Sequence, residues 1–274
     1  MKISVIISTY NSPLWLEKVL WGYECQTYKD FEVVIADDGS GEPTQTLINQ
    51  YKKTSSLNII HVWHKDDGFQ KTRILNKAIL ASSGDYLIFS DGDCIPRANF
   101  VAVHAAKAQK GCFLSGGYFM LPMETSESIA EADIKSGRAF DADWLIAHGL
   151  KKNFKTNKLT SSGFKEKFLN FITPTKATWN GHNASGWKSD LLSVNGFNEE
   201  MQYGGEDREL GERLMNKGIR GIQIRYSAIC VHLDHKRGYN TQESILKNKM
   251  IRQETRKLRK TWTELGITRS LNEN

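Results

Sequence analysis

Apolar and polar positions alternate along the first hundred residues in a way that predicts strands and helices in turn. Residues 2–8 are rich in β-branched side chains and end in a polar turn, which is typical of a buried strand. From Leu14 to about Gln26 the apolar positions recur at helical spacing, and residues 31–36 form a second β-branched run. A strand, a helix and a second strand make a βαβ unit.

The same alternation continues to residue 89. It predicts a helix near 43–53, a strand at 58–63, a helix at about 70–82 and a strand at 86–89. Alternating elements of this kind predict an α/β fold, with a mostly parallel sheet that helices cover on both faces.

After about residue 100 the alternation becomes less regular. We expect a helix at 97–109, a strand around 112–119, an irregular stretch at 150–178, a helix at 206–217, strands at 222–226 and 228–231, and a basic helix at 241–262. Neither an internal repeat nor a Gly/Ser linker divides the chain. The pattern therefore predicts a single domain over residues 1–235, followed by a basic helical extension over 236–274.

The composition, 39% hydrophobic and 25% charged, is that of a globular protein. A net charge of +6 favours anionic partners but does not choose among nucleotide sugars, phospholipid surfaces and nucleic acids.

The four cysteines have no metal-ligand or CxxC spacing, and a reduced cytosolic setting fits them best. The first apolar stretch is too short for a signal peptide, and no window approaches a membrane span, so we expect a cytoplasmic protein, soluble or peripheral to the membrane.

Polar clusters follow three predicted strands, at residues 8–11, 37–38 and 91–93. Because parallel strands deliver ligand-binding residues at their carboxyl ends, these clusters should line one crevice. Asp91 and Asp93 are two residues apart in an extended segment and point the same way, and two carboxylates beside a diphosphate favour Mg²⁺ or Mn²⁺. The alternative is an ordinary Asp-Gly turn.

Other ionisable residues stand at the ends of predicted elements. Glu206 and Asp207 begin a helix, where acidic residues also act as simple caps worth roughly 0.3–1 kcal/mol. His232 and His235 follow an apolar strand, where a histidine can complete a metal site. Arg73 lies near a helix start, positioned for a phosphate or an acidic residue, unless it belongs to a solvated helix face.

These motifs resemble those of a known family. The segments 2–11, 37–40 and 90–93 are similar to those of the GT-A fold glycosyltransferases of family 2. The segments 183–187, 195–200 and 204–211 are similar to the carboxyl-terminal region of galactosyl- and N-acetylgalactosaminyltransferases, including the bacterial chondroitin polymerases. The resemblance covers roughly residues 1–235, with several motifs in the family's order.

The resemblance implies an inverting, metal-dependent transfer of GalNAc or galactose from a UDP-sugar to a hydroxyl of a glycan or lipid-linked glycan, in polysaccharide biosynthesis of the capsule or O-antigen type. Residues 1–100 would form the nucleotide-sugar-binding half. Ser8, Tyr10 and Asp38 would hold the uridine, with Asp38 on the uracil. Arg73 would lie near the base and diphosphate, and Asp91 near the ribose.

The acceptor and catalytic half would span residues 101–235. The resemblance implies that Asp93 ligates Mn²⁺ or Mg²⁺ and that His232 is a further ligand, with His235 left open as the alternative. Asp207 would be the catalytic base, and Glu206 would bind the acceptor or donor sugar.

Other protein classes fit the sequence less well. A dehydrogenase needs a glycine-rich turn after its first strand, a P-loop kinase needs GxxxxGK[ST], and a sugar nucleotidyltransferase is expected to carry a glycine-rich basic loop there; none of these occurs. A non-catalytic glycan-binding module would have lost the Asp91/Asp93 pair or the Glu206/Asp207 pair, and both are intact.

The basic run over 247–260 forms one helical pattern beside a single Trp262. Nucleic-acid binding would require basic residues interleaved with aromatic ones on a defined module, so we expect no nucleic-acid partner. The run is either a solvated helix or a peripheral contact with an anionic membrane that carries a lipid-linked acceptor.

Overall fold

The computed structural model of the 274-residue chain describes residues 1–152, 154–235 and 241–268. In its first part the strands and helices alternate as the sequence predicts, and their ends differ from the predicted ones by two residues or fewer. The elements are β1 (Ile3–Thr9), α1 (Pro13–Glu24), β2 (Phe31–Asp37), α2 (Glu42–Thr54), β3 (Asn58–Trp63), α3 (Lys71–Ala81) and β4 (Tyr86–Asp91).

Over the described residues, the main sheet has the strand order β3-β2-β1-β4-β8-β6-β9. The strands β3, β2, β1 and β4 run parallel, and β6 (Cys112–Ser115) is parallel to β9 (Arg220–Gln223). Between these two parts lies β8 (Ala184–Trp187), which is antiparallel to both β4 and β6. The prediction of a mostly parallel sheet is therefore confirmed.

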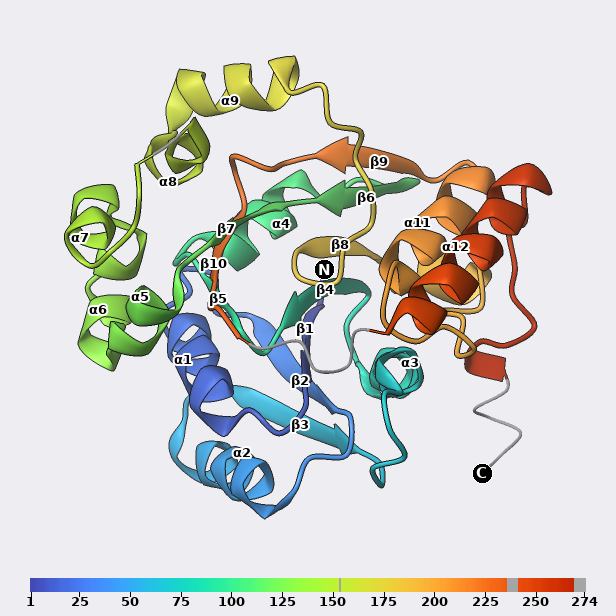
Figure 1. The fold of residues 1–274 in the computed structure, drawn as a ribbon, viewed down its shortest axis with the longest axis horizontal. Helices are drawn as coiled ribbons and strands as arrows, with labels where there is room; N and C mark the ends of the chain where they lie inside the picture. Colours follow the sequence, from blue (N-terminus) through green and yellow to red (C-terminus); the bar gives the residue numbers. More distant parts are fainter. Residues whose placement is uncertain (153, 236–240, 269–274) are drawn as a thin grey trace.

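Helices cover both faces of this sheet, as predicted. Along β1, Val5 and Ile7 pack into a core with α1, α2 and α4 (Phe100–Lys107), whereas Ile6 points the other way, into a core with α3 and α11 (Glu206–Asn216). Figure 1 shows α1 and α2 to the left of β1 and α3 to its right. The sheet is thus buried on both sides, which explains its almost continuous apolar strands.

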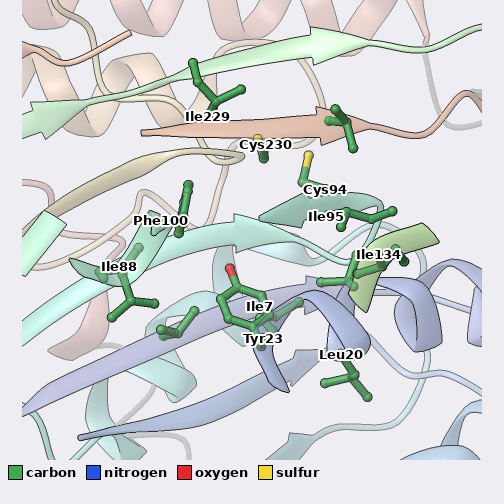
Figure 2. Packing of buried hydrophobic residues seen from close by; sticks show 14 of the residues in the cluster. Ile7, Leu20, Tyr23, Ile88, Cys94, Ile95, Phe100, Ile134, Ile229 and Cys230 are labelled. Carbon is green, nitrogen blue, oxygen red and sulfur yellow. The ribbon is translucent and has the colours of Figure 1, made fainter. Parts of the chain in front are cut away.

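The core on the α1 side is centred on Tyr23 (Figure 2). The rings of Tyr23 and Phe100 meet edge to face, with their centroids 6.5 Å apart, and both side chains are fully buried. Burial of a large apolar side chain contributes roughly 1.5–3 kcal/mol. This packing holds the carboxyl end of β1, where the polar cluster 8–11 begins.

The prediction of one strand over 112–119 is wrong. The segment divides into β6 and β7 (Gly117–Met120), and β7 belongs to a second sheet of order β5-β10-β7, with β5 (Cys94–Pro96) and β10 (Ile229–His232). The chain changes sheet at Gly116, where a Cβ atom would lie 1.9 Å from Asn183 Oδ1. A run of apolar residues on both sides hides this break in the sequence.

Two other predicted elements are shifted. The helix predicted over 97–109 begins only at Phe100, because the backbone N–H of Arg97 donates to the carbonyl of Ile229 in β10, at 3.0 Å. The strand predicted over 222–226 is β9, which ends at Gln223 because residues 224–227 form a turn. The strand predicted over 228–231 is confirmed as β10.

Short helices connect β7 to β8, and three of those that the structure describes lie in the stretch 150–178 that was predicted to be irregular. They are α5 (Met123–Ser128), α6 (Glu131–Lys135), η1 (Arg138–Phe140), α7 (Ala142–Ala147), η2 (Phe154–Thr156), α8 (Asn157–Thr160) and α9 (Gly163–Ile172). Figure 1 shows them along the left and upper edge of the molecule. None of the helices in the described part of the chain has the length and apolar run that crossing a bilayer requires.

The basic helix predicted over 241–262 is α12 (Gln242–Lys257), and it packs on α11, which follows α10 (Lys188–Ser193). The Thr255 hydroxyl donates to Glu209 Oε1 at 2.9 Å, and Arg252 donates to Glu212 Oε1 at 2.6 Å. The described part of the predicted extension 236–274 therefore contacts the helix whose first turn carries Glu206 and Asp207.

Candidate active site

A cleft of about 1580 Å³ opens at the carboxyl ends of β1 and β4. Ser8 and Asp91 are register partners on these strands, so the polar clusters that follow them emerge side by side. Nine of the ten residues that the sequence singled out line this cleft: Ser8, Tyr10, Asp38, Asp91, Asp93, Glu206, Asp207, His232 and His235. Segments far apart in the sequence thus meet as predicted.

Asp91 is held by two donors. The Ser8 hydroxyl donates to Asp91 Oδ1 at 2.7 Å, and the Lys71 ammonium donates to the same oxygen at 2.6 Å. Burial by itself would raise the pKa of Asp91, but the Lys71 charge and these hydrogen bonds hold it below its usual range. Asp91 is therefore an ionised carboxylate whose position is fixed by Ser8 and Lys71.

Asp38 lies further along the same edge of the sheet. Its Oδ1 lies 2.8 Å from His64 Nε2, and its Oδ2 accepts the backbone N–H of Gln70 at 3.0 Å. Tyr10, whose ring is half exposed, donates its hydroxyl to Asp66 at 2.9 Å. An oriented carboxylate beside an exposed aromatic ring provides an acceptor and a stacking surface, which suits a planar heterocycle.

Arg73 does not line the cleft, whereas Lys71 does. Arg73 instead donates to Gln70 Oε1 at 3.3 Å, within the first turn of α3. The two basic residues are two positions apart in a helix, so their side chains point about 200° away from each other. Lys71 is therefore the cation that α3 contributes, and the sequence motif that includes both residues did not reveal which one would face the cleft.

Asp93 and His232 meet at one side of the cleft. His232 Nδ1 lies 2.7 Å from the carbonyl oxygen of Leu233, and because a carbonyl only accepts, Nδ1 carries the hydrogen. The lone pair on His232 Nε2 then faces Asp93 Oδ1 at 3.7 Å. Metal-binding histidines are commonly held through their other nitrogen in this way, so the two residues fit a divalent cation.

His235 and Cys94 also contact Asp93. His235 Nε2 lies 3.0 Å from Asp93 Oδ2, and its ring stacks on that of His232 with the centroids 5.5 Å apart. Cys94 Sγ donates to Asp93 Oδ1 at 3.3 Å, and burial raises the pKa of this thiol, so it remains protonated. Hard divalent cations prefer carboxylate oxygens to thiol sulfur, which leaves the carboxylate of Asp93 and an imidazole nitrogen as the stronger ligand atoms.

Glu206 and Asp207 begin α11 after Gly204 and Gly205, both of which have positive φ. Burial raises the pKa of Asp207, against the N–H of Gly181 and the Lys71 charge, which lower it. Burial also raises the pKa of Glu206, and the neighbouring Asp207 charge adds to this effect.

The cap alternative accounts for only part of this geometry. Asp207 Oδ1 accepts from the backbone N–H of Arg208 at 2.7 Å, within its own helix. Its Oδ2, however, accepts the N–H of Gly181 at 3.0 Å, from a loop more than twenty residues away. Asp207 is thus oriented in the cleft by a segment outside α11.

His182 is a cleft residue that the sequence did not single out. Burial lowers its pKa to about 4, so the imidazole is neutral, and its ring meets the edge of Tyr118 with the centroids 4.5 Å apart. The only signal in the sequence is its place immediately before the motif 183–187.

A basic wall, which we define as Lys155, Lys158 and Arg225, lines the cleft next to β7 and β9. Lys158 donates to the carbonyl of Tyr118 at 2.9 Å, and burial lowers its pKa to about 8, helped by the charges of Arg225 and Lys155. Within the described residues, neither Lys158 nor Arg225 has an acidic side chain in ion-pair contact. Like charges held together in this way attract an anion.

The chain matches two known sequence families in succession. Residues 4–133 match "Glycosyl transferase family 2", and residues 172–236 match "N-terminal domain of galactosyltransferase". These two matches include every residue assigned to the site from the sequence.

Curated relatives include the uncharacterized glycosyltransferase YfnE of Bacillus subtilis, which is 26% identical over 90% of this chain and 69% of its own length. Validoxylamine A glucosyltransferase of Streptomyces hygroscopicus subsp. jinggangensis is 29% identical over 89% of this chain and 58% of its own length. Chondroitin synthase of Escherichia coli is 26% identical over 79% of this chain and 32% of its own length. The chain thus spans only part of each relative.

Solved structures share the fold at low sequence identity. S. aureus TarS in complex with UDP-GlcNAc has a TM-score of 0.58 and 18% identity, covering 87% of this chain and 60% of TarS. GalNAc-T7 with UDP, GalNAc and Mn²⁺ has a TM-score of 0.62 and 14% identity, covering 91% of this chain and 47% of GalNAc-T7. The fold is therefore that of the GT-A glycosyltransferases, as the resemblance implied. Within that class, glycosyltransferase family 2 is the family whose model residues 4–133 match.

Proposed function

We propose that this chain is an inverting glycosyltransferase that moves GalNAc or galactose from a UDP-sugar to a hydroxyl of a glycan acceptor. The observation that carries the proposal is that Asp207 and the Asp93/His232 pair line the same cleft, beside the nucleotide-side residues Asp38 and Asp91. A base and a cation site facing one cavity are what a single displacement at an anomeric carbon requires.

The donor's nucleotide would lie along the ends of β1, β2 and β4. Asp38 would accept a hydrogen bond from the uracil, and the ring of Tyr10 would stack against it. Asp91, ionised and fixed by Ser8 and Lys71, would bind the ribose hydroxyls. Lys71 would contribute positive charge beside the diphosphate, in place of Arg73.

Asp93 and His232 would hold the divalent cation, Mn²⁺ or Mg²⁺, which when bound offsets the charge of the departing diphosphate. Two of the solved structures with this fold contain Mn²⁺, which supports the choice. We assign His232 as the ligand because Leu233 fixes its tautomer, and His235 as the partner that orients Asp93.

Asp207 would accept the proton of the attacking hydroxyl. The Gly181 N–H orients its carboxylate, and burial brings its pKa nearer to that of an effective base. Glu206, on the same turn, would hydrogen-bond the acceptor or donor sugar. The displacement needs no covalent enzyme intermediate, so a single carboxylate base is sufficient.

The basic wall would meet the acceptor, since it lies on the β6 and β9 side, away from Asp38. A cationic wall favours an acceptor that carries a carboxylate or phosphate, such as an acidic glycan or a lipid-linked glycan of a capsule or O-antigen type pathway. Residues 101–235 would then form the acceptor half of the single catalytic domain predicted over 1–235.

The experiment that tests the function is UDP release across UDP-, GDP- and dTDP-sugars, with Mn²⁺, Mg²⁺ or EDTA, followed by NMR of the product's anomeric configuration. The proposal expects release from UDP-GalNAc or UDP-Gal that EDTA abolishes, and an inverted product. A non-catalytic binding module would bind the nucleotide sugar without release, and a nucleotidyltransferase would produce a nucleotide sugar instead of consuming one.

A further inference from the structure

The outward face of α9 is aromatic and exposed. Phe164, Phe168, Phe171 and Ile172 recur at intervals that place them on one side of the helix, and they are 83%, 50%, 88% and 48% exposed. An amphipathic helix of a globular protein normally turns such a stripe towards the core. In α9, which lies at the upper edge of the molecule in Figure 1, the stripe is exposed instead.

The inner face of α9 is held to the protein by polar contacts. Asn170 Oδ1 accepts the backbone N–H of Tyr226 at 2.9 Å, and Asn170 Nδ2 donates to the Ser227 hydroxyl oxygen, also at 2.9 Å. The Ser227 hydroxyl donates to Glu166, and Leu169 is buried beside them. Because these bonds fix the rotation of the helix about its axis, the aromatic residues must point outward.

The segment around α9 is also strongly basic. Residues 151–176 contain seven lysines and one acidic residue, a net charge of +6 that equals the net charge of the whole protein. The acidic residue, Glu166, faces inward. At helical spacing Lys165 and Lys167 lie at the two borders of the aromatic stripe, and both are exposed.

We propose that α9 docks on an anionic lipid surface. Phe164, Phe168 and Phe171 would enter the boundary between headgroups and acyl chains, while Lys165 and Lys167 bind the headgroups. An aromatic face bordered by lysines on an interfacial helix is the pattern that binds in the plane of a bilayer. Each basic residue near an anionic leaflet strengthens binding about fivefold.

The charge distribution argues against a second copy of the chain as the occupant. A symmetric contact through α9 would bring two segments of charge +6 together, and like-charge contacts oppose association. The ion pairs of α12, the basic helix that the sequence predicted as a possible membrane contact, argue against that helix as the lipid-binding surface. Arg252 and Arg256 contact Glu212, and Lys247 contacts Glu200. Those basic groups are at least partly neutralised within the protein.

The test is co-sedimentation with phosphatidylcholine vesicles, with and without phosphatidylglycerol. We expect the parent chain to bind the anionic vesicles, and the double variant Phe164→Ser/Phe171→Ser to lose most of this binding while keeping its circular dichroism and melting temperature. The matched control is Leu246→Ser/Met250→Ser on α12, which removes two residues that are 58% and 69% exposed and should bind like the parent. Lys165→Gln/Lys167→Gln should weaken anionic-vesicle binding roughly 25-fold.

A second readout measures insertion directly. Phe164→Trp should gain a fluorescence component that brominated lipids quench, whereas the parent's tryptophan emission should change less. Equal vesicle binding by the parent and Phe164→Ser/Phe171→Ser would overturn the proposal. Two other results would overturn it, provided that vesicles bind neither the parent nor the serine variant. One is a concentration-dependent dimer of the parent in light scattering that the serine variant does not form, and the other is binding of the parent to a single-stranded oligonucleotide that the serine variant loses. None of these readouts depends on transferase activity.

Discussion

The Lys71 ammonium lies 2.6 Å from Asp91 Oδ1, and its pKa is raised by the charges of Asp91, Glu206 and Asp207, which outweigh its burial. One lysine thus stands between the carboxylate assigned to the ribose and the carboxylate assigned as the base. This arrangement links donor binding to the protonation of Asp207.

We therefore predict that Lys71→Met changes the pH profile of turnover. The Asp207 base acts only when ionised, so turnover falls as pH falls through its pKa, which burial already holds above the ordinary value. Removing the Lys71 charge raises the pKa of Asp207 further, so the acid limb of kcat should move to higher pH. Lys71→Arg should leave the limb close to that of the parent. An unmoved limb in Lys71→Met would mean that the base is another group.

The metal assignment predicts different results for two neighbouring histidines. Asp93→Ala and His232→Gln should each weaken Mn²⁺ binding at least tenfold, measured by titration calorimetry in the presence of UDP. His235→Gln should weaken binding less than His232→Gln does, because the glutamine amide can still donate to Asp93 and orient its carboxylate. The reverse order of the two histidine variants would make His235 the ligand.

The sequence predicts those parts of the fold and site that depend on short-range patterns. The strands and helices from β1 to β4 follow from apolar periodicity, and the Asp91/Asp93 and Glu206/Asp207 pairs are adjacent along the chain. The side of α3 that faces the cleft was not predictable, because Lys71 and Arg73 differ only in helical phase, which the start of α3 after Gln70 sets.

Two other features depend on contacts distant in sequence. The break between β6 and β7 occurs where Gly116 passes Asn183, and nothing near residue 116 in the sequence shows how close these two come. In α9 the apolar residues recur at helical spacing, but they lie on the outer face. Because such a pattern normally marks the side of a helix that faces the core, it could not show that this face is exposed.

A buried histidine next to β8 predicts how stability depends on pH. His104 contacts the hydroxyl of Ser185 at 2.7 Å and Asn183 Oδ1 at 3.0 Å, and burial lowers its pKa to about 4. Its unfolded pKa is about 6.5, so the unfolded state binds the proton first and stability falls as pH falls from 6.5 towards 4. Between pH 7 and 5 this residue should cost about 2 kcal/mol of unfolding free energy.

Urea unfolding at the two pH values measures this cost. His104→Gln can keep a donor for Asn183, but the glutamine side chain does not titrate. The unfolding free energy of this variant should therefore change less between the two pH values, by about the same 2 kcal/mol. An identical pH dependence in parent and variant would show that His104 is not a source of acid sensitivity.

The basic wall predicts selectivity among acceptors. Lys158→Gln/Arg225→Gln should raise KM for an acidic acceptor by about tenfold to a hundredfold, since each charged hydrogen bond is worth roughly 1.5–3 kcal/mol before solvent screening. The same double variant should leave KM for a neutral acceptor nearly unchanged. Donor affinity serves as the internal control. A similar loss for both acceptors, or a loss of UDP affinity, would move the basic wall to the donor side.

The central claim is that Asp207 is the base rather than a helix cap. Asp207→Asn keeps an oxygen that can accept the Gly181 N–H but cannot take a proton, so UDP-sugar affinity and the fold should survive. The matched control is Glu243→Gln, an acidic residue in the first turn of α12, which should lose only about 0.3–1 kcal/mol of stability.

The most direct test is to measure turnover, donor affinity and melting temperature of Asp207→Asn on one preparation. The account predicts that turnover falls by about 10²–10⁴-fold, which is roughly 3–5 kcal/mol of barrier, while donor affinity stays near that of the parent. A variant that melts at a lower temperature but transfers sugar at the parent's rate would contradict it.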